Sequence, residues 1–175
     1  VLKDQPPMDT VHVSFSTIAL AGRASDPRVT EAMLTLARHL LERGRTVRIV
    51  AGSEGAFGAL PVALVPEAEL VHGADLLVAV GGDGTMLHAA RMAAACDVPV
   101  LGVNRGRLGF LADIGPDRML ESVDDALEGH CQSETRMLLE AHWARDISDR
   151  VGKQESPAAF RDWLASRQPA LSRDQ

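Results

Sequence analysis

Residues 75–95 decide the fold: they read DLLVAV at Asp75–Val80, GGDG at Gly81–Gly84 and TMLHAARMAAA at Thr85–Ala95. The first segment is a continuous apolar run of strand length, which is typical of a parallel strand buried on both faces. The last segment is rich in helix-forming residues. A buried strand that leads through a glycine turn into a helix is the repeating unit of α/β proteins, so this stretch predicts a parallel sheet.

Strand and helix patterns alternate on both sides of this unit. Further strands are expected at Val13–Ala21, Thr46–Ala51, Val98–Val103 and Arg136–His142. The glycines that follow the second of these strands predict a flexible loop at 52–58. Alternation of this kind predicts a doubly wound, Rossmann-like parallel sheet with right-handed crossovers.

Two more helices are delimited by their end residues. Asp26-Pro27 and Gly115-Pro116 are typical helix starts, while Gly44 and Gly129 are typical stops. Apolar side chains recur every three or four residues in both helices, which predicts one buried face for each. These side chains are Val29, Met33, Ala37, Leu40 and Leu41 in the first helix, and Met119, Leu120, Val123 and Leu127 in the second.

The sequence suggests three regions. Residues 1–10 are polar and contain two prolines, which predicts a flexible arm. Residues 11–144 carry the α/β pattern. Residues 145–175 have a different character, with one helix expected at 156–167, where Phe160, Trp163 and Leu164 share a face.

Composition excludes several classes of protein. The 175 residues carry a net charge of −6 and only 3% aromatic residues with no Tyr, which disfavours nucleic-acid binding. Two cysteines are too few for a disulfide framework or a metal site, and the histidines lack metal-ligand spacing. No apolar run approaches the length of a membrane helix, and polar residues interrupt the signal-like stretch at 11–22. We therefore expect a soluble, cytoplasmic protein.

The glycine turn at Gly81–Gly84 is the candidate site for ligand binding and catalysis. Ligands bind at the carboxyl ends of parallel strands, and the N-terminus of a helix attracts phosphate. A carboxylate in that setting, Asp83, could accept a hydrogen bond from a ribose hydroxyl, take its proton or hold Mg²⁺; alternatively, it merely caps the helix. Arg23 and Arg91 could reach phosphate, whereas a packing or solvent-facing role is favoured for His88.

Two segments resemble the paired signature of the ATP-dependent NAD kinases: GGDGTMLHAAR at Gly81–Arg91 and GVNRGRLGFLAD at Gly102–Asp113. The GGDG turn occurs more loosely in diacylglycerol kinases and 6-phosphofructokinases, but the longer motifs are specific. IALAGR at Ile18–Arg23 and RMLLEA at Arg136–Ala141 also resemble that family's first domain. The resemblance implies transfer of the ATP γ-phosphoryl group to the 2′-hydroxyl of the adenosine ribose of NAD, with Mg²⁺ accompanying ATP.

The resemblance also implies roles for single residues. Asp83 would be the catalytic base near the 2′-hydroxyl, and Gly82 and Gly84 would belong to the nucleotide-binding turn. The second nucleotide-contacting loop would contain Asn104, Arg105, Gly109 and Phe110, with the Phe near the adenine of NAD.

The chain also departs from the family. NAD kinases continue into a β-rich second domain that supplies an Asn-Glu or Asn-Asp pair and a Thr/Gly-rich stretch; Asn104 is the sole asparagine here, and Thr135 is the last threonine. We therefore expect this chain to contain only the first-domain part of the active site.

Three alternatives to an active NAD kinase remain. The chain could be a catalytically incomplete nucleotide-binding module, or a subunit that forms a homo-oligomer or associates with an intact NAD kinase. It could also be a lipid kinase, which the NRGRLGF segment disfavours.

Overall fold

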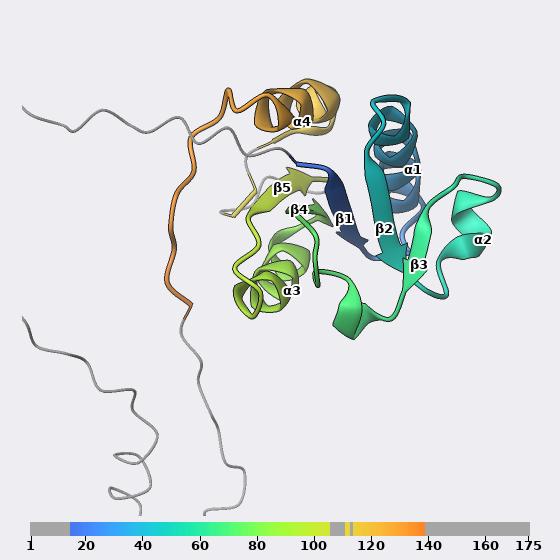
Figure 1. Ribbon diagram of the computed structural model, residues 1–175, viewed down its shortest axis with the longest axis horizontal. Coiled ribbons are helices and arrows are strands. Elements are labelled where there is room, and N and C mark those ends of the chain that lie inside the picture. Colours follow the sequence, from blue (N-terminus) through green and yellow to red (C-terminus); the bar gives the residue numbers. More distant parts are fainter. Residues whose placement is uncertain (1–14, 106–110, 113, 139–175) are drawn as a thin grey trace, which may run out of the picture. The chain divides into compact units, whose positions relative to one another are not determined.

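The computed structural model describes residues 15–105, 111–112 and 114–138 (Figure 1). The strands are β1 (Thr17–Gly22), β2 (Thr46–Val50), β3 (Ala63–Val65), β4 (Leu76–Gly81) and β5 (Val100–Asn104). The helices are α1 (Pro27–Glu42), α2 (Glu54–Phe57), α3 (Asp83–Ala94) and α4 (Met119–Leu127), with 3-10 turns η1 (Glu67–Glu69) and η2 (Pro116–Arg118). The chain divides into two units, Val1–Thr135 and Arg136–Gln175, and all these elements belong to the first.

The five strands form one sheet in the order β3-β2-β1-β4-β5, and every neighbouring pair is parallel. The chain runs outward from β1 to β3 and then returns to β4, on the other side of β1. The strand order therefore reverses between β1 and β4, which is where open parallel sheets bind ligands. The predicted doubly wound α/β fold is confirmed.

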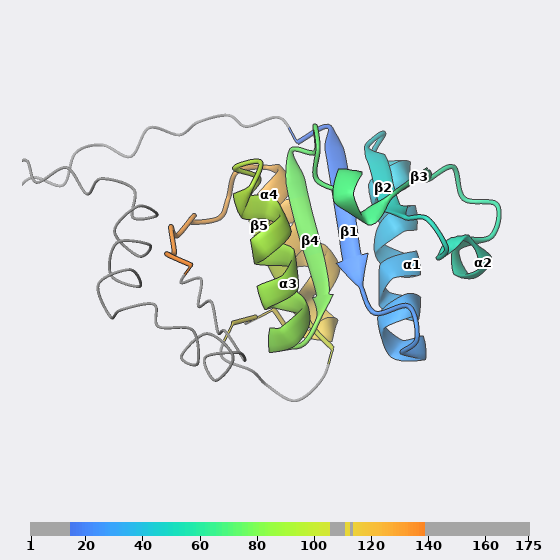
Figure 2. The same ribbon diagram turned by 90° about the horizontal axis from the view of Figure 1, so that it is seen from below.

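Helices cover both faces of the sheet. Figures 1 and 2 show α1 and α4 on one face and α3 on the other. A larger apolar core lies under α1 and α4, and a smaller one lies under α3. Within the described part of the chain, no helix has both the length and the apolar character needed to cross a bilayer.

Helix α1 begins as its end residues predict. The Asp26 carboxylate caps the helix by accepting a hydrogen bond from the backbone N–H of Arg28 at 3.0 Å, and Pro27 occupies the first helical position. At the other end, Gly44 has a φ of +69°, which favours glycine. The predicted apolar face is buried against the sheet except for Leu41, which is partly buried, and Ala32 and Leu36 extend the face.

A polar cluster joins α1 to α4 on the same face of the sheet. His39 Nε2 lies 2.8 Å from Asp124 Oδ1, and Arg43 Nη2 donates to Asp124 Oδ2 at 2.7 Å. Arg43 Nη1 also lies 3.1 Å from His39 Nδ1. The cluster joins the two helices through side chains that are 81 and 85 residues apart in the chain.

The structure differs from the expected elements at three places. The segment expected to be a flexible loop contains α2, whose Phe57 is buried in the larger core. The sequence analysis missed β3, a three-residue edge strand that pairs with β2 through Arg48↔Ala63. No strand forms at 136–138, where the side chains are exposed, and the rest of the Arg136–His142 prediction lies outside the described residues. Packing and pairing, rather than local pattern, decide such short elements.

Other predictions cannot be compared in full. The arm at 1–10, the start of the first strand and the segment at 145–175 with its helix lie outside the described residues. Helix α3 begins two residues earlier than the sequence suggests, so Asp83 is its first residue.

Glycine at the end of β1 allows α1 to approach the sheet closely. A Cβ at Gly22 would lie 2.5 Å from Met33 Sδ and 2.7 Å from Val29 Cγ1. We expect Gly22→Ala to lower the free energy of unfolding by about 1–3 kcal/mol, because the added methyl group overpacks this contact. Urea denaturation measures the change, and Gly115→Ala, whose Cβ would meet nothing within 4 Å, is the control. Equal stability of Gly22→Ala and the parent would contradict such close packing.

Candidate functional site at the carboxyl edge of the sheet

The two motif segments meet at the carboxyl edge of the sheet. Gly81 ends β4 and lies in register with Asn104, which ends β5. The next residue, Arg105, donates its backbone N–H to the carbonyl of Gly81 at 3.0 Å. Asn104 is buried, and its own N–H bonds to the carbonyl of Ile114. The start of the second motif is thus held directly against the glycine turn.

Asp83 links these segments through its side chain. Its Oδ1 accepts a hydrogen bond from the backbone N–H of Leu111 at 3.1 Å, which joins residues 28 positions apart. The interpretation of Asp83 as a simple helix cap is wrong, since Gly82 occupies the N-cap position and no side chain caps α3. The carboxylate instead lies in the first turn of α3, where the helix dipole favours a negative charge.

The glycines of the turn differ in what surrounds them. A Cβ at Gly81 would overlap Thr85 Oγ1, so packing within the protein requires glycine there. Gly82 and Gly84 are exposed, and a Cβ at either would meet no atom of the described residues within 4 Å. Neither has a positive φ, so no described residue and no backbone strain requires glycine at these two positions.

A cavity of about 250 Å³ opens on the α1 side of the glycine turn. Its charged lining residues are Arg23, Asp26, Arg28 and Arg105. Arg28 Nη2 lies 3.0 Å from Asp26 Oδ2. Hydrogen bonds from Arg28 lower the pKa of Asp26 below its ordinary value of 3.8, so this carboxylate is charged at neutral pH. Arg23 was expected to reach phosphate from the sequence, whereas Arg28 belongs to no recognisable motif.

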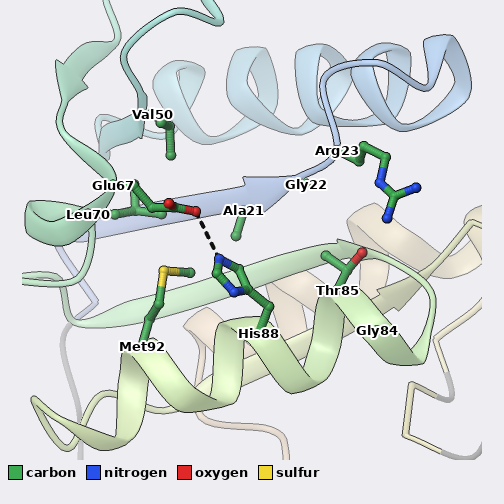
Figure 3. A pocket seen from close by; sticks show the side chains of 10 residues that line it. All are labelled: Ala21, Gly22, Arg23, Val50, Glu67, Leu70, Gly84, Thr85, His88 and Met92. Carbon is green, nitrogen blue, oxygen red and sulfur yellow. Dashed lines mark hydrogen bonds and ion pairs between the residues drawn. The ribbon is translucent and has the colours of Figure 1, made fainter. Parts of the chain in front are cut away.

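A second cavity, of about 270 Å³, lies on the α3 side (Figure 3). It shares Arg23, Gly84 and Thr85 with the first cavity. Across its opening, His88 Nε2 lies 2.8 Å from Glu67 Oε1. His88 is exposed, as the sequence analysis favoured, but its partner Glu67 stands in η1 without any sequence signal.

The remaining predicted site residues are placed as follows. Gly109 and Phe110 lie outside the described residues. Arg91 is exposed on α3 and lines neither cavity. Across the described ranges, no three His, Cys, Asp or Glu side chains are grouped closely enough to hold a metal ion.

Comparison with known proteins places this site in a family. The model of the ATP-NAD kinase N-terminal domain matches residues 18–131, which extend from the second residue of β1 through α4 and include both motifs. The chain is 40% identical over 153 residues to the NAD kinase of Chromobacterium violaceum, covering 87% of this chain and 51% of that protein. It is 43% identical over 148 residues to the NAD kinase of Chromohalobacter salexigens, covering 83% of this chain and 48% of that protein.

A solved structure agrees in fold. Yeast NADH kinase, determined in complex with NADH, superposes with a TM-score of 0.62 at 23% identity, over 72% of this chain and 43% of the yeast chain. The chain spans about half the length of the curated relatives that it matches. The resemblance inferred from the two motifs is confirmed: the chain belongs to the NAD kinase family and carries that family's N-terminal domain.

Proposed function

We propose that this chain supplies the nucleotide-binding half of an NAD kinase, which transfers the γ-phosphoryl group of ATP to the 2′-hydroxyl of the adenosine ribose of NAD. The observation that carries the proposal is the hydrogen bond from Leu111 N–H to Asp83 Oδ1. It joins the two family motifs at the carboxyl edge of the sheet, beside two glycines with open space around them.

In this proposal Asp83 is the catalytic base. The 2′-oxygen forms a bond to the γ-phosphorus as its proton passes to the Asp83 carboxylate, and the bond from the γ-phosphorus to the bridging oxygen breaks to release ADP. A carboxylate is a weak base toward an alcohol. Positioning and electrostatic stabilisation therefore supply most of the acceleration. The Leu111 hydrogen bond contributes by orienting the carboxylate.

The second loop is proposed to contact the nucleotide, with Phe110 near the adenine of NAD. Asn104 and Arg105 stand beside Gly81 at the end of β5, which supports their assignment to the nucleotide. Gly109 and Phe110 are assigned to the same loop on the basis of the family motif. Gly82 and Gly84 would let the nucleotide approach the backbone.

Magnesium is proposed to accompany ATP. Mg²⁺ is commonly held by phosphate oxygens with one or two carboxylates, so the scarcity of grouped acidic side chains in the described residues is compatible with it. When bound, the ion would neutralise charge on the transferred phosphoryl group.

Gly84→Ala tests the nucleotide assignment, because we expect opposite effects on stability and binding. Alanine in place of glycine within a helix stabilises the protein by about 0.4–1 kcal/mol where no strain results. The new Cβ would stand where both cavities meet, since Gly84 lines both. We therefore expect a more stable chain that binds NAD or ATP about tenfold more weakly, a cost of about 1.4 kcal/mol.

Thermal unfolding and NMR titration of the 175-residue chain with NAD and with ATP measure the two effects. Gly55→Ala in α2 is a matched control: its Cβ also meets nothing within 4 Å, and Figure 1 shows α2 at the far edge of the sheet from α3. Gly55→Ala should leave binding unchanged. Unaltered binding of both nucleotides by Gly84→Ala would refute the assignment and leave the turn with a structural role alone.

A further inference from the structure

We propose that Arg23, Arg28 and Arg105 form a phosphate-binding subsite on the α1 side of the glycine turn, for the phosphoanhydride chain of a nucleotide substrate. The inference rests on the proposed function, because it names the part of the substrate that this edge of the sheet holds. Of the three arginines, the motif resemblance assigns only Arg105, and it does so without a ligand group.

The three side chains come from separate segments that the fold brings together. Arg23 follows β1, Arg28 is the second residue of α1, and Arg105 follows β5. All three line the cavity of about 250 Å³, together with the backbone of the glycine turn. Figure 3 shows Arg23 leaving the end of β1 beside Thr85, in the first turn of α3.

Charge favours an anion in this cavity. Its lining holds three guanidinium groups and one carboxylate, Asp26, although the chain as a whole has a net charge of −6. Asp26 is already paired with Arg28. Among the described residues, no hydrogen bond or ion pair engages the side chain of Arg23. The cavity therefore concentrates positive charge in an acidic protein, as a polyphosphate site requires.

Arg105 adds a second, independent observation. Its backbone is fixed to Gly81, and its Nη2 donates to the carbonyl of Arg28 at 3.3 Å. Its Nε is buried and has no hydrogen-bond partner among the described residues. A buried N–H without a partner is costly, and an anion oxygen in the cavity would satisfy it.

The helix that borders the cavity supplies further donors. No side chain caps α3. The first backbone hydrogen bond of this helix is donated by Met86 N–H to the carbonyl of Gly82. The amides that precede Met86 therefore face the turn, together with the positive end of the helix dipole. Guanidinium groups and a helix N-terminus are the two main phosphate ligands that proteins use.

The neighbouring cavity is less suited to phosphate. It shares Arg23 with the subsite, but its wall also carries the Glu67 carboxylate, which repels an anion. Its other lining residues are mainly apolar, such as Val50, Leu70 and Met92. The phosphoanhydride chain is therefore assigned to the α1 side.

Inorganic tripolyphosphate is the probe, because it carries the proposed chemistry and requires neither a nucleoside nor kinase activity. We expect the 175-residue chain to bind it, more weakly as salt is raised. Arg28→Ala should weaken binding about tenfold, as the loss of a charge-assisted hydrogen bond predicts. The Arg28 side chain is 69% exposed, so its removal leaves the core intact. Calorimetric titration measures the affinity, and circular dichroism verifies the fold.

Arg38→Ala is the matched control. It removes the same charge from an exposed position of the same helix, ten residues further along α1. Arg28→Lys retains the charge but loses the planar guanidinium group, which can donate two parallel hydrogen bonds. Its affinity for tripolyphosphate should therefore lie between those of Arg28→Ala and the parent. Absence of tripolyphosphate binding by the parent, or equal losses for Arg28→Ala and Arg38→Ala, would overturn the subsite.

Titrations with ATP and NAD identify the source of the phosphates. If Arg28→Ala lowers the affinity for ATP alone, the subsite binds the phosphates of the phosphoryl donor. If it lowers the affinity for NAD alone, the subsite binds the diphosphate of the acceptor. The proposed function is judged separately, by whether the parent chain binds the two nucleotides at all.

Discussion

Asp83→Asn is expected to reduce NADP formation by about 100-fold or more, because an amide cannot take the proton of the ribose hydroxyl. The stability of the protein should stay within about 0.5 kcal/mol of the parent. Asn Oδ1 can still accept the hydrogen bond that Leu111 N–H donates to Asp83 Oδ1, so the two motif segments remain joined. The substitution therefore removes the base and keeps the link.

The measurement needs an enzyme with a complete site. We suggest this chain extended by the C-terminal half of the Chromobacterium violaceum NAD kinase, which is 40% identical to it over the shared part. NADP is followed with a coupled dehydrogenase, and unfolding is followed by heat.

Asp83→Ala is the matched variant for the structural role. It loses the proton acceptor and the Leu111 bond together, so we expect the same loss of activity and an additional destabilisation of about 0.5–1.5 kcal/mol. Unchanged turnover by Asp83→Asn would exclude Asp83 as the base. Equal stability of Asp83→Asn and Asp83→Ala would show that the bond to Leu111 contributes nothing.

The 175-residue chain by itself is expected to produce no sustained NADP while still binding nucleotide weakly. The family resemblance implies that a second domain contributes an asparagine pair and a Thr/Gly-rich stretch. The sole asparagine of this chain is Asn104, which is buried at the end of β5. Phosphoryl transfer requires donor, acceptor and metal to be positioned together. Without the residues of the second domain, the rate of transfer should therefore fall by many orders of magnitude. Binding through the turn and the helix N-terminus should remain, at roughly millimolar affinity or about −4 kcal/mol.

The chain is incubated with ATP, Mg²⁺ and NAD, and NADP is measured beside the extended chain as the positive control. Turnover of roughly 1 per second, which is typical of competent kinases, would overturn the expectation. It would mean that residues 145–175 complete the site. No turnover together with retained binding would support the interpretation as a nucleotide-binding half.

Much of the fold could be predicted because its signals are local. The run at 75–80 is apolar throughout, and the capping residues Asp26 and Gly44 act through their own neighbouring backbone. The missed strand β3 has three residues and depends on pairing with β2 through Arg48. The missed helix α2 depends on burial of Phe57. No pattern of three or four residues carries such information.

The family and the α/β class follow from the sequence alone, because the glycine turn and both motifs are contiguous and their chemistry can be recognised without coordinates. Which side chains meet depends on the three-dimensional fold. It joined Asp83 to Leu111, placed Arg28 beside Arg23 and Arg105, and paired His88 with Glu67. These contacts depend on strand register and on how closely the helices approach the sheet. Both result from packing among segments far apart in the chain, which no local spacing of residues encodes.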